Sequence, residues 1–370
     1  MTWVTGLTHG NNLVRISWSS KLHRQTQARM VLSAKGMVRA DVGDEPSFER
    51  RAGAPIVSQE KLNGRRAQEV RLGLALQLTR NRTAATGVRS INAYTHSTGN
   101  MIDNEEQPAL SNTIGYVEQM KHAASFDVPE VQDLRSEFKM TVRSADLLAD
   151  WMAAEMEDSR LDATYDKYSA HVVAGLSVST GDPPAANLQY GNRKSADGEL
   201  NGSDRLTAAE LRRMATWAAT NNINPCSAMG QESFLLLCHS FNYADLWDDE
   251  TFRQAYESGW QRAAEKMGNP MFSFADCYYA GIFVYKYDRI RASSASANVR
   301  RCILLGADAI GEGITSRPKL VRRKEDRYED LFGLAVKAIN GWFRLDFAPQ
   351  SGTTLWQGGA IWALYTETAA

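Results

Sequence analysis

The chain has 370 residues, and its 42 basic and 43 acidic side chains leave a net charge close to zero. This charge balance does not favour binding to nucleic acid or to a membrane surface. No run of apolar residues approaches the roughly 18 residues of a membrane span. Four cysteines stand far apart without CxxC spacing, and the N-terminal sequence lacks the pattern of a signal peptide. We therefore expect a soluble protein of two or three structural units, with reduced thiols in a cytoplasmic setting.

The charges are unevenly distributed along the chain. Residues 1–82 carry a net charge of +8, and residues 83–160 carry a net charge of −7. The two segments could fold on each other within one subunit. Alternatively, a basic arm could lie on an acidic region of a neighbouring copy in a head-to-tail contact. Composition leaves both interpretations open.

The first third of the chain predicts an arm followed by a long hairpin. Residues 1–66 show little apolar periodicity, which predicts an extended arm. Residues 69–78 alternate strictly between apolar and other side chains, as in a half-buried strand, and residues 113–120 predict the returning strand. The polar stretch 80–112 between them is long for a loop in a compact domain, so we expect it to be functional or to grip a partner.

A long helix is predicted over residues 129–160. Pro129 suits its first turn, and Glu130 and Asp133 suit the positive end of its dipole. A helix of this length is too long for a small domain to cover, so we expect part of it to face a partner or a long sheet. Apolar residues recur along it at spacings of three and four, namely Val131, Leu134, Phe138, Val142, Ala145, Leu148, Met152 and Met156.

The second half of the chain mixes helices and strands. Thr207 and Glu210 have the spacing of a capping box at the start of one helix. No regular alternation of strand and helix appears, which favours an α+β fold over a doubly wound sheet. The predicted helices cover 206–222 and 248–267, and the predicted strands cover 234–239, 280–288, 299–306 and 333–347, the last as one or two strands.

The sequence "FLLLCHSFNYADL" places Cys238 beside His239 at the end of a predicted strand. Neighbouring side chains on a strand point to opposite faces, so the two cannot act on each other as nucleophile and base. A buried, inert thiol is the favoured interpretation, and the remaining histidines show no metal-ligand spacing. The glycines of 306–313 do not fit GxGxxG and predict a turn between a strand and a short helix. We expect no catalytic, cofactor-binding or metal-binding residue.

The densest basic stretch is 317–327. Nonspecific contact with phosphates is one interpretation, but Glu325 and Asp326 dilute the charge and no aromatic platform accompanies it. A solvated turn or an intersubunit ion-pair patch is favoured. Its basic residues are Arg317, Lys319, Arg322, Arg323, Lys324 and Arg327. The sequence thus predicts large surfaces, an arm, a long loop and a long helix, and it shows no catalytic site. This combination is typical of a subunit of an assembly.

Five blocks occur in an order that resembles the major capsid protein of tailed bacteriophages, in the short-tailed-phage branch with the Hong Kong 97-like fold. The resemblance covers about residues 67–350, and Ser240 stands where the family pattern has a proline. The blocks are "NLQYGNRKSADGELNGSDRLTAAELRRMATWAA" (187–219), "FLLLCHSFNYADLWDDETFRQA" (234–255), "GNPMFSFADCYYAGIFVYKYDRI" (268–290), "RRCILLGADAI" (300–310) and "EDRYEDLFGLAVKAINGWFRLDF" (325–347).

The resemblance implies hexamers and pentamers of this chain in an icosahedral head around packaged double-stranded DNA, which the inner face meets non-specifically. Portal, scaffolding and cement or decoration proteins would be further partners, and the shell is expected to be non-covalent. The protein would be made and assembled in the host cytoplasm and reside in the virion. The implied parts are an N-terminal arm (1–66), an extended hairpin loop (67–120, tip 80–112) that overlaps an adjacent subunit, a peripheral domain (121–222) with a spine helix (129–160), an axial domain (223–316) and return strands (317–370).

The charge asymmetry suggests intersubunit contacts between the basic arm and the acidic loop and helix. Two other classes stay open: a cytosolic enzyme with a cleft between its two units, and a nucleic-acid-binding protein that uses 317–327. The basic candidates for the contact are Arg50, Arg51, Arg65 and Arg66, and the acidic candidates are Asp103, Glu105, Glu106, Glu130, Asp133 and Glu137.

Overall fold

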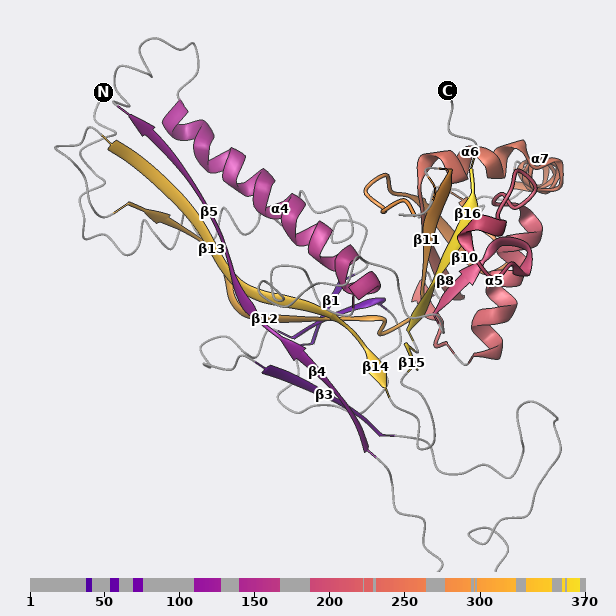
Figure 1. Ribbon diagram of the computed structural model, residues 1–370, viewed down its shortest axis with the longest axis horizontal. Helices are drawn as coiled ribbons and strands as arrows, with labels where there is room; N and C mark the ends of the chain where they lie inside the picture. The colour runs from indigo at the N-terminus through magenta and orange to yellow at the C-terminus, as the bar shows by residue number, and fades with distance from the viewer. Residues whose placement is uncertain are drawn as a thin grey trace, which may run out of the picture.

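The protein is α+β, as predicted, with an elongated unit and a smaller rounded unit side by side (Figure 1). Within the described ranges it contains four α-helices and two large sheets. The computed structural model describes residues 38–41, 54–59, 69–75, 110–127, 140–166, 187–221, 223–228, 231–263, 277–293, 296, 298–323, 331–347, 355–356 and 358–366.

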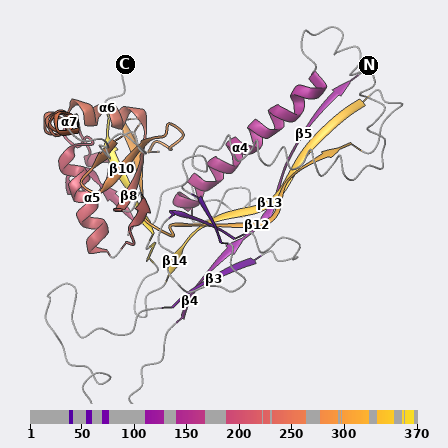
Figure 2. The same cartoon turned by 180° about the vertical axis from the view of Figure 1, so that it is seen from behind.

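The elongated unit is built on a five-stranded sheet in the order β1–β2–β12–β13–β5. Its long strands β12, β13 and β5 pair antiparallel, and β2 pairs in parallel with the first four residues of β12. Helix α4 lies along this sheet in both views (Figures 1 and 2). The strands are β1 (Val38–Asp41), β2 (Ile56–Gln59), β5 (Glu118–Asp127), β12 (Ile310–Arg322) and β13 (Leu331–Arg344).

The predicted long helix is α4 (Met140–Asp166), which continues six residues beyond the predicted end at 160. Its predicted apolar stripe is confirmed where it is described, because Leu148, Met152 and Met156 are buried in the core. The first part of the predicted helix, before Met140, lies outside the described residues.

The smaller unit contains a seven-stranded sheet in the order β6–β16–β11–β8–β10–β9, with β7 paired to β8. The predicted strands 234–239, 280–288 and 299–306 correspond to β8, β10 and β11, and 333–347 corresponds to β13 and β14. No strand was predicted at β6, β7, β9, β12, β15 or β16. The bounds are β6 (Leu188–Tyr190), β7 (Cys226–Ala228), β8 (Gln231–Cys238), β9 (Cys277–Tyr279), β10 (Ile282–Lys286), β11 (Val299–Leu305), β14 (Asp346–Phe347), β15 (Leu355–Trp356) and β16 (Gly359–Tyr365).

Three helices cover one face of this sheet: α5 (Ala208–Thr220), α6 (Ser240–Asp248) and α7 (Glu250–Ala263). Helices α5 and α7 confirm the predictions for 206–222 and 248–267, whereas α6 was not predicted. Because successive side chains of β8 point to opposite faces of the sheet, its apolar residues contribute to two different cores. Leu236 and Cys238 pack with the helices α5–α7, and Leu235 and Leu237 pack on the other face with residues of α4.

Helix α4 therefore contributes to the core of both units. Its residues Met156, Leu161 and Tyr165 belong to one buried cluster with Leu237 and Ile303 of the seven-stranded sheet. The same cluster includes residues of β13 in the elongated sheet. A helix of 27 residues is about 40 Å long, enough to reach across both.

A β-hairpin leaves the elongated unit, as predicted for 69–120. Strand β3 (Glu69–Ala75) pairs antiparallel with β4 (Leu110–Tyr116), which starts three residues before the predicted returning strand. Residues 76–109, which include most of the predicted tip, lie outside the described residues. Where the chain passes from β4 to β5 it runs close to β13, and a Cβ at Gly341 would stand 2.0 Å from the carbonyl oxygen of Tyr116. Only glycine fits this approach.

Two predictions about local structure were wrong. Residues 306–309 form a turn between two strands, β11 and β12, and not between a strand and a short helix. Residues 317–322 lie on β12 and not in a solvated turn.

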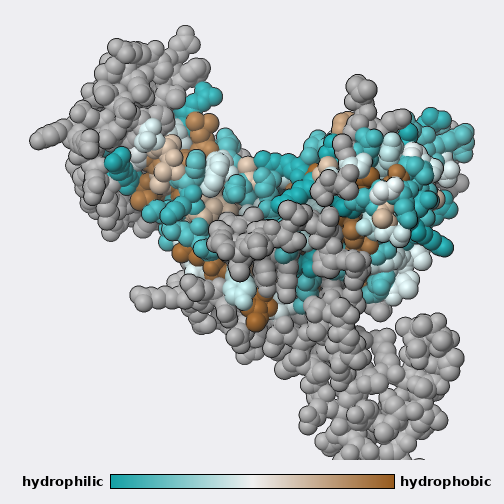
Figure 3. All heavy atoms as spheres, in the orientation of Figure 1, coloured by the Kyte–Doolittle hydropathy of each residue, from teal (hydrophilic) through white to brown (hydrophobic). Residues whose placement is uncertain are grey.

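On the face shown in Figure 3, hydrophilic residues cover most of the smaller unit. None of the described helices is both long and apolar enough to cross a membrane.

Candidate functional site

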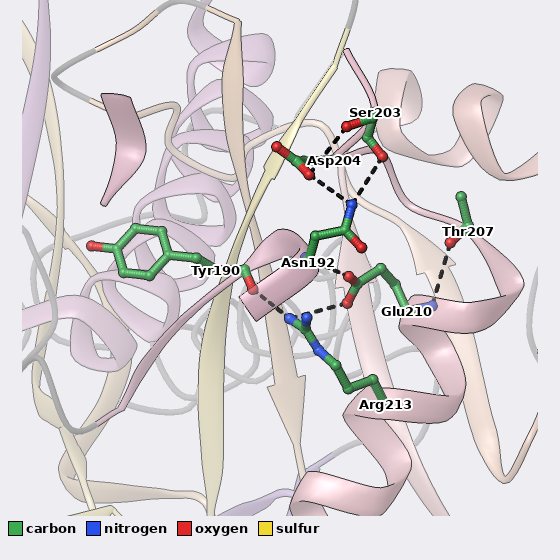
Figure 4. Close-up of polar contacts among 7 residues, drawn as sticks. All are labelled: Tyr190, Asn192, Ser203, Asp204, Thr207, Glu210 and Arg213. Carbon is green, nitrogen blue, oxygen red and sulfur yellow. Dashed lines mark hydrogen bonds and ion pairs between the residues drawn. The ribbon is translucent and has the colours of Figure 1, made fainter. Parts of the chain in front are cut away.

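A cluster of polar side chains joins the start of α5 to the turn that follows β6 (Figure 4). Thr207 caps α5, since its hydroxyl oxygen accepts a hydrogen bond of 3.3 Å from the backbone N–H of Glu210. This is one half of the predicted capping box. The carboxylate of Glu210 does not complete the box at Thr207 but turns towards Asn192 and Arg213.

Both oxygens of Glu210 are engaged within the protein. Oε1 accepts a 2.6 Å hydrogen bond from the backbone N–H of Asn192, and Oε2 lies 3.1 Å from the guanidinium of Arg213. Arg213 also donates to the carbonyl oxygen of Tyr190. Burial raises the pKa of Glu210, while the Asn192 N–H and Arg213 oppose the rise. A buried carboxyl with a raised pKa is a common general acid or base. Here its contacts indicate a structural role, because they hold the turn against α5.

The turn itself has an unusual backbone. Asn192 and Arg193 both have positive φ, 49° and 60°, and the Lys194 N–H donates to the Gly191 carbonyl at 3.1 Å. These are the features of a type I′ turn, in which glycine usually takes the second central position. The Asn192 side chain donates to Asp204 Oδ1 at 2.6 Å, which helps to fix the conformation. The strain, of order 1–3 kcal/mol per residue, is offset by this network.

A pocket of about 530 Å³ opens beside the cluster, between 188–195 and the second half of α5. It is lined by the aromatic residues Trp217 and Trp362 and by the cations Arg193, Lys194 and Arg213, among others. No carboxylate lines it. The pocket lies within the smaller unit and not between the two units, where the enzyme hypothesis placed its cleft. Its chemistry suits contact with a polar or anionic group.

Cys238 and His239 have structural roles. The Cys238 thiol is fully buried and lies 3.6 Å from the carbonyl oxygen of Tyr285. His239 is the N-cap of α6, because its Nδ1 accepts a 3.2 Å hydrogen bond from the Phe241 N–H. Burial, together with nearby Arg300, lowers the pKa of His239.

The four cysteines are all buried, and none of them forms a disulfide. Burial raises the pKa of Cys226 to about 12, so this thiol stays protonated near neutral pH. Among the described residues, no group of three His, Cys, Asp or Glu side chains is placed to hold a metal ion.

Polar contacts also fasten α4 to the smaller unit. The Tyr287 hydroxyl donates to Glu157 Oε2 at 2.8 Å, and Arg291 pairs with Asp162 and Asp166. Burial raises the pKa of Asp162, and Arg291 opposes that rise. These pairs could not be predicted from the sequence, since their members stand more than 120 positions apart.

A buried ion pair fastens α4 to the elongated sheet. Arg160 of α4 and Glu312 of β12 are 1% and 2% exposed, and their charged groups lie 3.3 Å apart. Near the end of β13, Arg344 pairs with Asp346 at 2.7 Å and donates to the carbonyl oxygen of Thr164 at 3.2 Å. Helix α4 is thus held to the elongated sheet by a buried ion pair, and to the smaller unit by a buried hydrogen bond and by ion pairs of the exposed Arg291.

Most of the predicted contact residues cannot be placed. Of the basic stretch, Arg317, Lys319, Arg322 and Arg323 are exposed on or just after β12. The residues outside the described part are Arg50, Arg51, Arg65, Arg66, Asp103, Glu105, Glu106, Glu130, Asp133, Glu137, Lys324 and Arg327.

Comparison with known proteins identifies the fold. The profile of a family described as phage capsid protein matches residues 20–359. The capsid of Ralstonia phage GP4 superposes with a TM-score of 0.65 over 89% of this chain and 93% of its own, at 16% identity. The cyanophage Pam1 capsid asymmetric unit gives a TM-score of 0.66 over 92% of each chain, at 15% identity.

The acidic stable capsid structure of Helicobacter pylori bacteriophage KHP30 is also similar, with a TM-score of 0.62 over 88% of this chain and 90% of its own, at 11% identity. At such identities the likeness shows the fold. No curated protein matches this sequence.

Proposed function

Since this chain belongs to the phage capsid protein family, we propose that its copies form hexamers and pentamers that close an icosahedral head around packaged double-stranded DNA. It is a phage major capsid protein with the Hong Kong 97-like fold, and its role is structural. The family match over residues 20–359 carries this conclusion. The described fold supports it, because a hairpin leaves the body of the subunit and one long helix serves both units.

We assign the elongated unit to the peripheral domain, the smaller unit to the axial domain and β3–β4 to the extended loop. Strand β6 and helix α5 pack with the seven-stranded sheet. The boundary that we propose between the two domains therefore moves from residue 222 to before Leu188. Residues 317–322 and 331–344 lie in the elongated sheet, and residues 359–365 lie in the seven-stranded one.

The further partners that we propose are those of a phage head: portal, scaffolding and cement or decoration proteins, and DNA on the inner face. Capsid proteins are virion components, and synthesis and assembly in the host cytoplasm are part of the proposal. We propose a non-covalent shell without catalysis. Denaturing electrophoresis of particles should show a single band near 41 kDa, whereas a ladder of multiples would contradict the non-covalent shell.

We further propose that the basic arm meets acidic residues of a neighbouring subunit. The candidates are the pairings between Arg50, Arg51, Arg65 and Arg66 and the acidic segments 103–106 and 127–137. Such charge pairs mainly set orientation and encounter rate, while apolar burial supplies most of the free energy. Unchanged assembly after reversal of the sign of Arg65 and Arg66 would show that this pairing is wrong.

The function is tested by electron microscopy and size-exclusion chromatography of the purified chain, expressed with and without its neighbouring phage genes. We expect closed shells, or the hexamers and pentamers that precede them. A stable monomer or small oligomer that never assembles, even with those partners, would refute the proposed assembly.

A further inference from the structure

Three lysines stand in one row across the elongated sheet. Lys337 of β13 lies directly opposite Lys121 of β5, and it also lies directly opposite Lys319 of β12. All three side chains are exposed. Because directly paired residues project from the same face of an antiparallel sheet, the three ammonium groups emerge side by side.

The row projects from the face opposite helix α4. The next residues along the three strands, Met120, Val336 and Leu320, pack into the core that contains α4. Alternation then turns their lysine neighbours to the other side of the sheet. Arg323 belongs to this face as well, since its side chain lies over Gly333 of β13.

This arrangement is unfavourable within one subunit. Like charges directly opposite each other destabilise a sheet. Within the part of the chain that the structure describes, none of the three lysine side chains forms a hydrogen bond or an ion pair. The immediate neighbours of the row on this face of β5 and β13 are Gln119, Ala123, Ala335 and Ile339, and none of these four is a carboxylate. The described part of the subunit therefore does not compensate the charge of the row.

We propose that this lysine row docks an acidic segment of a second copy of this chain, so that carboxylates of one subunit neutralise the lysines of the next. This inference rests on the proposed self-assembly. Charge complementarity within the chain supports it, because residues 83–160 carry a net charge of −7. Opposite charges on different parts of one chain suit a head-to-tail contact between copies.

The surroundings of the row favour a polypeptide over DNA as the occupant. Val321 is 37% exposed, and the small residues Ala123 and Ala335 lie beside the lysines. Such a face lets an extended segment lie flat and bury apolar area between the charges. A phosphate backbone would gain from the lysines alone.

The test compares the assembly of two triple variants. Lys121→Gln, Lys319→Gln and Lys337→Gln together remove the charge, whereas Lys→Arg at the same three positions retains it. Under the conditions in which the wild-type chain assembles after nuclease treatment, the Gln variant should need an about tenfold higher subunit concentration for half assembly. The Arg variant should assemble like the wild type.

The same variants separate docking from folding. The unassembled Gln variant should unfold at the wild-type temperature or above it, because the like-charge repulsion is gone. A lower unfolding temperature would show that the lysines stabilise the subunit itself, which contradicts the proposal. If the Gln variant reached half assembly at the wild-type concentration, the proposal would also be overturned. If the Gln variant assembled normally but its particles retained less DNA, the lysine row would be a DNA-binding surface instead.

The partner carboxylates can be identified in wild-type particles. A carbodiimide that joins amines directly to carboxylates should link these lysines to Asp or Glu of another subunit, as read by mass spectrometry of mixed isotope-labelled particles. Absence of such links, with the lysines equally open to acetylation in particles and free subunits, would refute the docking. If wild-type chains never assemble, the proposed capsid function is refuted. If wild-type chains assemble but the Gln variant assembles equally well, only the docking proposal is refuted.

Discussion

Replacing Glu312 by leucine should destabilise the subunit strongly, because it removes the carboxylate that lies against the buried guanidinium of Arg160. The two side chains are 1% and 2% exposed and 3.3 Å apart, so water cannot take the place of the missing carboxylate. Removing one partner of a buried ion pair typically costs about 3–5 kcal/mol. This is a large share of the roughly 5–15 kcal/mol that stabilises a typical domain. The expected fall in the unfolding temperature is on the order of 10 °C.

The matched control is the double variant Arg160→Met and Glu312→Leu, which removes both charges and keeps similar volume. It should recover at least half of the lost stability, since replacing a buried pair by apolar residues is often neutral. Thermal unfolding of the unassembled subunit, followed by intrinsic fluorescence, compares four proteins: the wild type, the single variants Glu312→Leu and Arg160→Met, and the double variant. A double variant as unstable as the sum of the two single variants would show that the pair is not coupled, and the reasoning would fail.

Three further predictions concern packing, pH and thiols. Gly341→Ala should lower stability by about 1–3 kcal/mol or more in denaturant unfolding, because its Cβ would meet the Tyr116 carbonyl; Gly198→Ala, with nothing within 4 Å, should be neutral. Glu210 has a raised pKa, so the folded state holds its proton more tightly, and stability should fall as pH rises above the ordinary value of 4.5. Glu210→Gln should reduce that slope in unfolding scans between pH 4 and pH 7. Cys226 should resist iodoacetamide at pH 8 in the native subunit and react only after denaturation; labelling at the rate of a free thiol would contradict its burial.

Strong local periodicity accounts for the elements that the sequence predicted well. The stripe of Leu148, Met152 and Met156 indicated α4, and the alternation in 69–78 indicated β3. The cap at Thr207 was visible from spacing alone. In each case the deciding interactions lie within a few residues of one another, so no knowledge of distant partners was needed.

The missed elements depend on distant or unusual partners. Helix α6 starts at a histidine cap, which is not a common capping residue, and its aromatic sequence suits a strand equally well. Strand β12 contains Pro318, which argues against an interior strand. The structure resolves the conflict, because β2 pairs only with Ile310–Gly313 and leaves the rest of β12 at the sheet edge. Register shifts between Ile314 and Lys319 also break its alternation.

The polar cluster and the lysine row could not be derived from the sequence. The Asn192–Glu210 contact joins residues 18 positions apart through a turn with two positive φ angles, for which Asn–Arg is a weak signal. The lysine row depends on the pairing register of three strands, which join positions 121, 319 and 337. Only the three-dimensional fold brings these side chains together.

The position of β16 in the smaller unit has a consequence for how the protein is made. This strand comes last among the strands of its sheet in the chain, yet it lies between β6 and β11, and Ala360–Leu364 are almost completely buried. During translation, β11 and β6 keep unpaired edges and an open apolar face until residues 359–365 leave the ribosome. Chains broken off before residue 359 therefore cannot complete the unit. Incomplete translation products would be excluded from a growing shell by their inability to fold, without any separate proofreading factor.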